Sequence, residues 1–365
     1  MKIKTITCHD VYNLGASLQA YALAAYLQSQ GHEVEIIDYQ PLYLRHYRLA
    51  GVPNPRFDKP FLREAYQIAK FPGRLYDRLT SKRKKAFDRF TAQYLPVTQT
   101  KYSDLASLRA APPEADLYIA GSDQIWNPLF QNGKDPAFFL DFVPEGKRRI
   151  SYAASFAAEE MSEASAKLMS PWLKKLDAIS VREKSGLELL GCMGLNGIWV
   201  VDPVFLLNID CWRKLAIPIP AGLFVYDFDN SPKVQEIAHR LANRENIKIV
   251  SAFPWAGAQE VFPDMGPQEF LGAIWNAKLV LSNSFHATAF ALIFHKNFFV
   301  VERQEKINAR MKDLLASVGL EDRLIDSAEM ALQAAPIDWS DVDKRLESQI
   351  FRSKKYLQDQ VSWMK

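Results

Sequence analysis

Cysteine is scarce in this chain of 365 residues, with only Cys8, Cys192 and Cys211. The three are far apart and form no CxxC pair, a spacing that argues against a disulfide framework and against a structural zinc site. The HxH and HExxH spacings of metal-dependent enzymes are also missing. We therefore expect free thiols in or near the core, no bound metal and no cofactor.

Long apolar runs are missing as well. No stretch approaches the roughly 18 residues of a membrane-spanning helix, and the opening residues, MKIKTITCHD, lack the apolar segment of a secretory signal. Neither sign of charge is in large excess, because the chain has 45 Lys and Arg and 42 Asp and Glu, which gives a formal charge of +3. So small an excess gives no indication of a nucleic-acid partner. We expect a cytoplasmic protein, free or at the inner face of the membrane.

The apolar residues that are present make up 48% of the chain, enough for a substantial core and for two domains. Residues 1–10 have the pattern of a strand, residues 17–32 that of an amphipathic helix stopped by Gly31, and residues 33–41 that of a second strand. This order predicts a βαβ unit with parallel strands. In such sheets ligands bind at the carboxyl ends of the strands, so the loop before residue 17 is a candidate binding loop.

The same alternation continues along the chain and starts again after residue 214. Further strand or strand-to-helix patterns of the first half lie at 115–128, 148–157, 176–190 and 198–207, and those of the second half at 222–229, 233–245, 247–253, 267–277, 278–284, 287–296 and 297–302.

The fold class predicted from this pattern is α/β, with two Rossmann-like domains that face a central cleft. We place the first domain at 1–214, with a helical insertion at about 42–100, and the second at 215–335. The remaining residues, 336–365, have helical spacing and are expected to form a helix, with packing on the first domain as one arrangement.

The loop "HDVYNLGAS" opens the first predicted helix with polar residues, among them Asn13. Free backbone N–H groups at a helix start suit an anion or a sugar hydroxyl. Neither GxGxxG nor a Walker A lysine is present, so the usual fingerprints of nicotinamide and P-loop nucleotide binding are lacking. The alternative is that Asn13 only caps the helix.

The segment "AGSDQIWNP" follows an apolar strand with a carboxylate, two amides and an indole. Asp123, Gln124 and Asn127 could bind sugar hydroxyls while Trp126 stacks on a sugar face. The alternative is a turn, in which Asp123 bonds its own backbone and Trp126 belongs to the core.

Two later strand ends carry further candidates. Arg182 ends the strand of "AISVREKSG", where a guanidinium beside a helix start suits a carboxylate or a phosphate. In "SNSFHATAF", Asn283, Ser284 and His286 lie between a strand and a helix, and an imidazole near a helix N-terminus would tend to stay neutral and act as a base. Solvation of Arg182, and capping and packing by His286, are the alternatives.

A basic run, Lys82 to Lys85, lies in the predicted insertion. Such runs are usually solvated helix faces. Contact with a membrane surface, or with an acceptor that carries a diphosphate, is the other interpretation.

Six of these motifs, taken in order, resemble the polysaccharide pyruvyl transferase family over roughly residues 1–330. They are "NLGASLQAYAL", "GSDQIWNP", "RISYAASF", "ISVREKSG", "VDPVFLL" and "SNSFHATAF".

The resemblance implies a GT-B-like fold and transfer of a pyruvyl group from phosphoenolpyruvate to two hydroxyls of a sugar, giving a ketal. The acceptor would be a cell-surface polysaccharide or its lipid-linked precursor, and a peripheral membrane contact would follow from the latter. Competing hypotheses are a GT-B glycosyltransferase that uses a nucleotide sugar and a noncatalytic glycan-binding protein.

The resemblance also implies roles for individual residues. In relatives an arginine matching Arg182 and a histidine matching His286 are implicated in donor binding or catalysis. If the resemblance holds, we predict His286 as the general acid/base or a hydrogen-bond donor to the phosphate, Asp123 as a second catalytic group, and Asn283 and Ser284 as donor-binding residues beside Arg182. Lys306 lies in the stretch that corresponds to a further basic donor contact in relatives. From the side chains of the two loops described above, and not from the resemblance, we predict Asn13, Gln124, Trp126 and Asn127 as acceptor-binding residues.

One position departs from the family. Several relatives have an arginine where this chain has Ser284. Either another arginine supplies that charge or the donor differs. For the separate basic contact assigned to Lys306, Arg303 and Arg310 are the competing residues.

Overall fold

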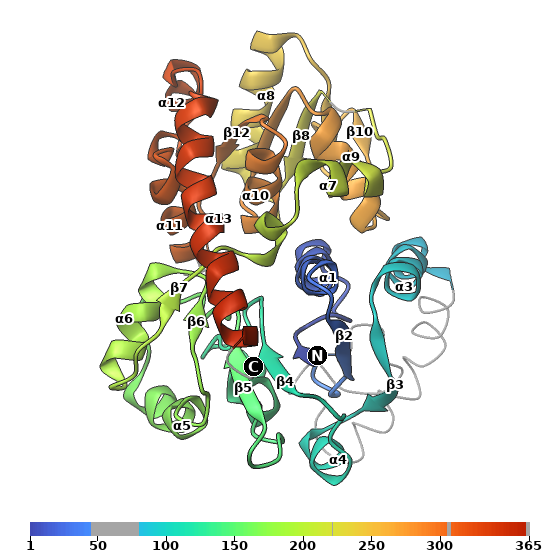
Figure 1. Ribbon diagram of the computed structural model, residues 1–365. Helices are drawn as coiled ribbons and strands as arrows, with labels where there is room; N and C mark the ends of the chain where they lie inside the picture. The colour runs from blue at the N-terminus through green and yellow to red at the C-terminus, as the bar shows by residue number, and fades with distance from the viewer. Residues whose placement is uncertain (45–79, 221, 305–307, 363–365) are drawn as a thin grey trace, which may run out of the picture.

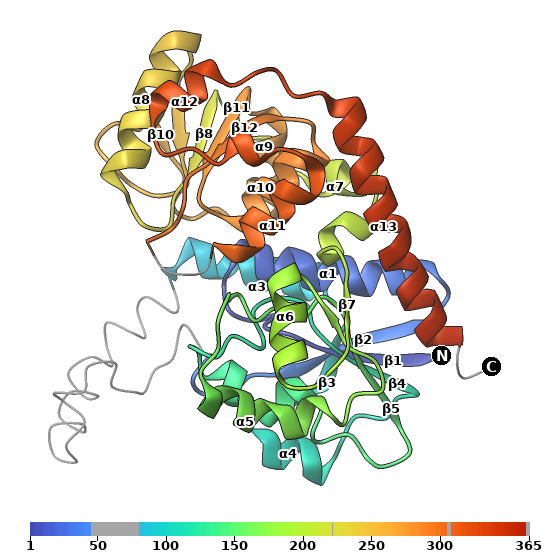
Figure 2. The ribbon, with the colours of Figure 1, turned by 90° about the vertical axis from the view of Figure 1, so that its left-hand side faces the viewer.

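The computed structural model describes residues 1–44, 80–220, 222–304 and 308–362 of the chain. It has two α/β domains, stacked one above the other in Figure 1 and Figure 2. Each domain contains a five-stranded sheet in which every recorded strand pair is parallel.

The first sheet has the strand order β3-β2-β1-β4-β5. Its strands are β1 (Lys2–Ile6), β2 (Glu33–Tyr39), β3 (Val97–Tyr102), β4 (Leu117–Ala120) and β5 (Arg148–Ser151). A short pair, β6 (Ser180–Val181) and β7 (Ile198–Trp199), lies beside it. Its helices are α1 (Leu14–Ser29), α3 (Lys82–Tyr94), α4 (Leu105–Ala110), α5 (Glu163–Leu173) and α6 (Lys184–Cys192), with single 3₁₀ turns η2 (Asn132–Lys134), η3 (Pro136–Phe139) and η4 (Pro203–Leu206).

The second sheet repeats this plan with the order β10-β9-β8-β11-β12. Its strands are β8 (Leu223–Tyr226), β9 (Ile249–Ser251), β10 (Glu260–Val261), β11 (Leu279–Ser282) and β12 (Asn297–Val300). Its helices are α7 (Ile209–Leu215), α8 (Pro232–Glu245), α9 (Pro267–Asn276), α10 (Phe285–Ile293), α11 (Ala309–Val318) and α12 (Ala328–Gln333), with the 3₁₀ turn η5 (Glu321–Arg323).

The predicted insertion at 42–100 is partly wrong, because its last residues belong to the sheet. Strand β3 pairs with β2 along the edge of the first sheet, with Val97 opposite Ile36. Three consecutive residues of β3 are exposed, so this edge strand lacks the apolar run by which the buried strands were recognised. The predicted helix corresponds to α3, and residues 45–79 lie outside the described residues.

Helix α13 (Trp339–Ser362) runs along both domains, as Figure 2 shows. Near its C-terminal end, the Tyr356 hydroxyl donates to the Ser151 carbonyl over 3.0 Å, and Ser353 Oγ accepts from the Val201 amide over 3.0 Å. Nearer its start, the Gln349 side chain donates to the Ser317 carbonyl of α11 over 3.0 Å. The helix therefore bonds to both halves of the chain, while the boundary near residue 214 stays a prediction.

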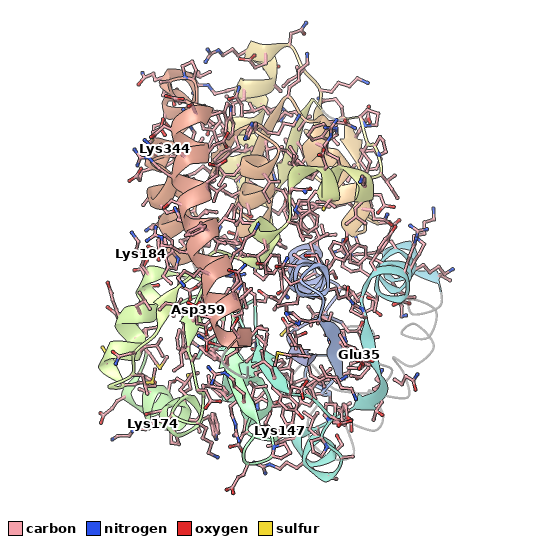
Figure 3. All side chains as sticks on the ribbon, in the orientation of Figure 1. Glu35, Lys147, Lys174, Lys184, Lys344 and Asp359 are labelled. Carbon is pink, nitrogen blue, oxygen red and sulfur yellow. The ribbon has the colours of Figure 1, made fainter. Side chains whose placement is uncertain are left out.

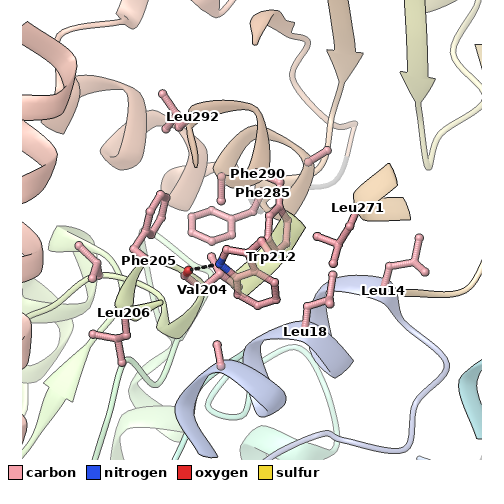
Figure 4. Packing of buried hydrophobic residues seen from close by; sticks show 14 of the residues in the cluster. Leu14, Leu18, Val204, Phe205, Leu206, Trp212, Leu271, Phe285, Phe290 and Leu292 are labelled. Atoms are coloured by element: carbon pink, nitrogen blue, oxygen red, sulfur yellow. Dashed lines mark hydrogen bonds between the residues drawn. The ribbon is translucent and has the colours of Figure 1, made fainter. Parts of the chain in front are cut away.

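A buried hydrophobic cluster is continuous between the domains (Figure 4). Leu14 and Leu18 of α1 belong to it together with Phe290 of α10. Trp212 of α7 stands at its centre, with its ring edge-on to Phe290 at 4.9 Å and its indole N–H donated to the Val204 carbonyl over 3.1 Å. Burial of apolar surface stabilises a folded chain by about 25 cal/mol per Å². The shared cluster therefore favours one position of the two sheets relative to each other.

The basic run at Lys82 opens α3 and is only partly solvated. Arg83 donates to the carbonyls of Tyr12 in the first domain and Met265 in the second, over 3.0 and 3.1 Å. Lys84 pairs with Asp88 one turn further along the helix. Half of the run therefore serves contacts within the protein, and Arg83 joins the two domains.

Other charged side chains, such as Lys147 and Lys174, lie on the outside of the first domain (Figure 3). Among the helices of the described residues, none combines the length and the apolarity needed to cross a membrane. The three cysteines are free thiols, but only Cys8 is buried, whereas Cys192 is exposed and so does not fit the expected place in or near the core.

Candidate functional site

His286 lies at the point where β11 gives way to α10. The strand LVLS is buried on all four residues, and the chain then turns through Ser284, whose Oγ accepts the Ala287 amide over 3.4 Å and caps the helix. This cap fixes the first turn of α10, so the imidazole one residue into the helix has a defined direction. His286 is 7% exposed and lies against the first domain.

Gly15 of α1 provides the space for that imidazole. A Cβ atom at this position would lie 1.9 Å from His286 Nδ1, far inside van der Waals contact. Since α1 belongs to the first domain and α10 to the second, the absence of a side chain at Gly15 allows the two helix starts to meet.

Asp202 is the carboxylate that lies next to the imidazole. It precedes η4, where its Oδ1 accepts the Val204 amide over 3.1 Å. Its Oδ2 is 2.6 Å from a terminal nitrogen of Arg182 and 3.5 Å from His286 Nε2. Burial acts to raise the pKa of Asp202, but His286 and Arg182 outweigh it and hold that pKa well below its usual range. Asp202 is therefore ionised at neutral pH.

Arg182 extends from the end of β6 into the same cluster. Besides Asp202, it faces Asp123, whose Oδ1 is 3.7 Å from its second terminal nitrogen, and its guanidinium lies 4.6 Å from the centre of the Phe285 ring. Burial acts to lower the pKa of Arg182, and the carboxylates Asp202 and Asp123 raise it above the usual value. Its Nε and second terminal nitrogen are buried without a hydrogen-bond acceptor.

Arg310 of α11 brings a second cation to the same ring. Its guanidinium lies 5.8 Å from the centre of Phe285, and its terminal nitrogens are 2.8 and 3.1 Å from the amide oxygen of Gln124 when that amide is oriented to accept. Burial and repulsion by Arg182 lower the pKa of Arg310 to about 10. Its Nε is also buried without an acceptor. Three donor nitrogens of these two buried cations, two on Arg182 and one on Arg310, therefore have no acceptor among the described residues.

Glu183, next to Arg182 in the chain, is hydrogen-bonded to the loop that follows β5. One carboxylate oxygen accepts from the Ser155 hydroxyl and from the amides of Phe156 and Ala157, over 2.7 to 3.0 Å. Burial raises the pKa of Glu183, against the opposing effect of Arg182. The hydrogen bonds fix the loop that follows β5 against the start of α6.

Of the predicted site residues, the structure brings together His286, Asp123, Arg182 and Gln124. The expectation for His286 considered only the start of α10, whereas the structure adds an acidic neighbour, Asp202. Asp123 is partly exposed, with 17% of its side chain accessible. The roles assigned to these residues stay predictions.

Three predicted ligand contacts have side chains that are engaged within the protein. Ser284 caps α10, and Asn13 caps α1 by accepting the Ala16 amide over 3.1 Å. Asn283 donates to Asp227 over 2.5 Å and accepts from the Phe228 amide over 3.0 Å. Contacts of Ser284 and Asn283 with a donor, and of Asn13 with an acceptor, would have to coexist with these bonds.

The expectation that Trp126 stacks on a sugar is wrong in this structure. The indole is 0% exposed, lies parallel to Phe139 at 5.5 Å, and donates to the Phe138 carbonyl. Asn127 is also 0% exposed, and its Oδ1 accepts the Leu129 amide over 2.9 Å. The alternative interpretation, a turn with a core tryptophan, is the one observed, because the loop after β4 turns both side chains inward.

Of the basic residues considered after β12, Lys306 lies outside the described residues. Arg303 donates to Asp229 from two nitrogens, each over 3.3 Å. Arg310 is the one that shares the Phe285 ring with Arg182.

Sequence reasoning gave no role to Asp202, although it lies in the quoted motif "VDPVFLL". The signal was a carboxylate at the end of an apolar run and before a proline. Its contacts are with Arg182 and His286, which are distant in sequence, so the motif alone could not show them.

Replacing Gly15 with alanine is expected to lower the turnover number about 100-fold, because the new methyl group must displace the imidazole and misplacement by about 1 Å can cost that much. Steady-state kinetics with the purified variant would measure the loss. Gly191→Ala is the control, since a Cβ atom there has no neighbour within 4 Å. Equal turnover in both variants would show that the imidazole need not hold this position.

Fold and site together define an α/β protein of two Rossmann-like domains whose charged cluster is assembled from both. Among solved structures, the chain is similar to the S. aureus MnaA-UDP co-structure, with a TM-score of 0.54 and 11% identity over 100% of this chain and 96% of that one. It is also similar to a protein from Listeria monocytogenes described as a UDP-N-acetylglucosamine 2-epimerase, with a TM-score of 0.52 and 10% identity over 96% and 90% of the two chains. These likenesses concern the fold, and they confirm the predicted fold class as GT-B-like.

The sequence decides the family. A family model described as polysaccharide pyruvyl transferase matches residues 13–305, most of the chain, and the chain therefore belongs to this enzyme family. A search of curated protein sequences found no significant match. The predicted family is thereby confirmed.

Proposed function

We propose that this enzyme transfers the pyruvyl group of phosphoenolpyruvate to two hydroxyls of a saccharide acceptor and so forms a cyclic ketal. The observation that carries the proposal is the pair of buried guanidinium groups, Arg182 and Arg310, over one phenylalanine ring with unused donors. Phosphoenolpyruvate has two anionic groups, a carboxylate and a phosphate, and guanidinium groups match both.

Arg310, the second cation, could also supply the positive charge that several relatives have at the position of Ser284. Arg310 brings a positive charge to the side chain of Phe285, the residue between Ser284 and His286. A guanidinium from α11 could therefore take the place of an arginine in the strand-to-helix turn. We accordingly assign Arg310 to the donor site beside Arg182.

The reaction requires one proton transfer to carbon and two from oxygen. The methylene carbon of phosphoenolpyruvate gains a proton, one sugar hydroxyl forms a bond to C2 and loses its proton, and the second hydroxyl displaces the phosphate at the same carbon and loses its own proton. The proton gained by the methylene carbon matches one of the two hydroxyl protons, the other is taken up by the departing phosphate, and the products are the ketal and inorganic phosphate.

The residues of the cluster suit these steps. His286 would give and take protons as general acid/base, and Asp202 would hold the imidazole in place and stabilise the imidazolium. Asp123, at the edge of the cluster, would orient an acceptor hydroxyl or remove its proton. The acceptor would be a sugar of a cell-surface polysaccharide or of its lipid-linked precursor.

Phosphoenolpyruvate is expected to raise the melting temperature of the protein, because a ligand that binds only the folded state stabilises it by an amount that grows with the logarithm of its concentration over its dissociation constant. Thermal-shift titration would measure this. Arg310→Met should abolish most of the shift, whereas Lys312→Met on the same helix, exposed and paired with Glu302, should keep it.

Nucleotide sugars, tested in parallel, separate the alternatives. Stabilisation by UDP-sugars but not by phosphoenolpyruvate would contradict the proposal and favour a glycosyltransferase. Stabilisation by neither would favour a protein that binds glycans without catalysis.

A further inference from the structure

Three phenylalanine rings are exposed in the part of the chain that the structure describes: Phe130, Phe228 and Phe351, with 45, 39 and 70% of their surface accessible. Phe351 lies on α13, whereas Phe130 and Phe228 follow strands β4 and β8 at the carboxyl ends of the two sheets. Ligands of open α/β sheets bind at those ends. An exposed ring there therefore calls for an explanation.

Phe228 is hydrogen-bonded to the strand-to-helix turn that leads to His286. Its amide donates to the side chain of Asn283 over 3.0 Å, and the Asn283 amide in turn donates to the Tyr226 carbonyl over 3.3 Å. Asn283 is three residues before His286 in the strand-to-helix turn. The exposed ring and the imidazole consequently belong to adjacent loops of the second sheet.

The ring is also held in one place. Its centre lies 4.9 Å from the centre of the Tyr226 ring, in a T-shaped arrangement, and 5.9 Å from that of Phe253, in a tilted one. The guanidinium of Arg303 lies over the ring, 5.1 Å from its centre. Asp227 fixes the loop by accepting the amides of Asp229 and Ser231 over 2.9 and 2.7 Å. A ring that is already ordered adds little entropic cost when a ligand binds.

The surroundings fit a sugar better than a protein partner. A pyranose needs an apolar surface for its C–H face and polar groups for its hydroxyls, and Phe228 supplies the first while the Arg303–Asp229 pair lies beside it. A single exposed ring is far smaller than the apolar patches of several hundred Å² that mark protein interfaces.

We propose that Phe228 is the stacking platform for the acceptor sugar, with the Arg303–Asp229 pair as its polar edge. The identification of the bound sugar as the acceptor rests on the proposed function. Phe228 takes the place of Trp126, which is buried, as the aromatic group of the acceptor site. The ligand class is a pyranose with one continuous C–H face.

Saturation-transfer NMR on the full chain would test the platform, with methyl glycosides of glucose, galactose, mannose and N-acetylglucosamine as probes. We expect binding of at least one of these glycosides, and Phe228→Ala should weaken it about tenfold, which is about 1.4 kcal/mol. Phe228→Trp should retain binding, because it keeps an aromatic face. Phe130→Ala and Phe351→Ala are matched controls that should leave binding unchanged.

Separate outcomes overturn the platform and the proposed reaction. The platform is overturned if no glycoside binds the native chain, if Phe228→Ala binds as well as the native chain, or if Phe130→Ala is the variant that loses binding. Loss of UDP binding in Phe228→Ala would show that the ring stacks on a nucleobase instead. The thermal shift with phosphoenolpyruvate should be unchanged in Phe228→Ala, so a failure of donor binding is detected independently.

Discussion

His286→Gln is expected to reduce the turnover number by about 10²- to 10⁴-fold, the usual contribution of a positioned acid/base group. Glutamine can still form hydrogen bonds near Asp202 but cannot carry a proton between substrate atoms. Phosphate release from phosphoenolpyruvate in the presence of a polysaccharide acceptor would measure the effect. The thermal shift with phosphoenolpyruvate should persist, because the arginines that hold the donor are unchanged.

The matched control lies at the other end of the same helix. His295 is 45% exposed on its side chain, stacks on Trp339 and pairs with Asp343. His295→Gln should therefore turn over at the native rate. If His286→Gln retained more than about a tenth of the native turnover, below the effect expected of an acid/base group, the imidazole would be a positioning group at most.

Arg182→Met is expected to lower the free energy of unfolding by about 3–5 kcal/mol, because it leaves the Asp202 carboxylate buried without its main cation. Urea denaturation would measure the loss. Donor binding should also fail, so this single variant cannot by itself separate folding from function.

A double variant makes the separation. Arg182→Met with Asp202→Asn removes both charges, so much of the lost stability should return, whereas donor binding should not. Arg240→Met is the surface control: its partner Glu329 is 56% exposed on its side chain, so the loss there should be below about 1 kcal/mol. A loss as small in Arg182→Met would show that the buried pair contributes little.

The fold could be predicted from the sequence because the buried strands consist of consecutive apolar residues. LVLS at β11 and LFVY at β8 are buried at every position, and each is followed by a helix pattern. Strand β3 was not predicted, because its exposed residues are polar and its place in the sheet depends on pairing with β2. Pairing between distant segments leaves no local pattern to recognise.

The site was predicted in part, for a similar reason. Arg182 stands directly after an apolar strand and His286 four residues after one, where a lone charged or imidazole group is conspicuous. Trp126 shows the limit of this reasoning, because the sequence gives residue type but not the direction of a side chain in a turn. Asp202 and Gly15 matter only through the residues they meet in space, His286 above all.

The hydrophobic cluster around Trp212 has a consequence for folding as well as for packing. Leu14 and Phe290, from the first and second domains, belong to the same cluster, so part of the core of each domain is buried only against the other, beside the clusters that each domain has of its own. A chain with one half unfolded would expose the apolar surface of both, which makes partial unfolding costly and the loss of structure cooperative. Because His286 meets Gly15 and Asp202 across the same boundary, this cluster of side chains is assembled only when both domains are folded.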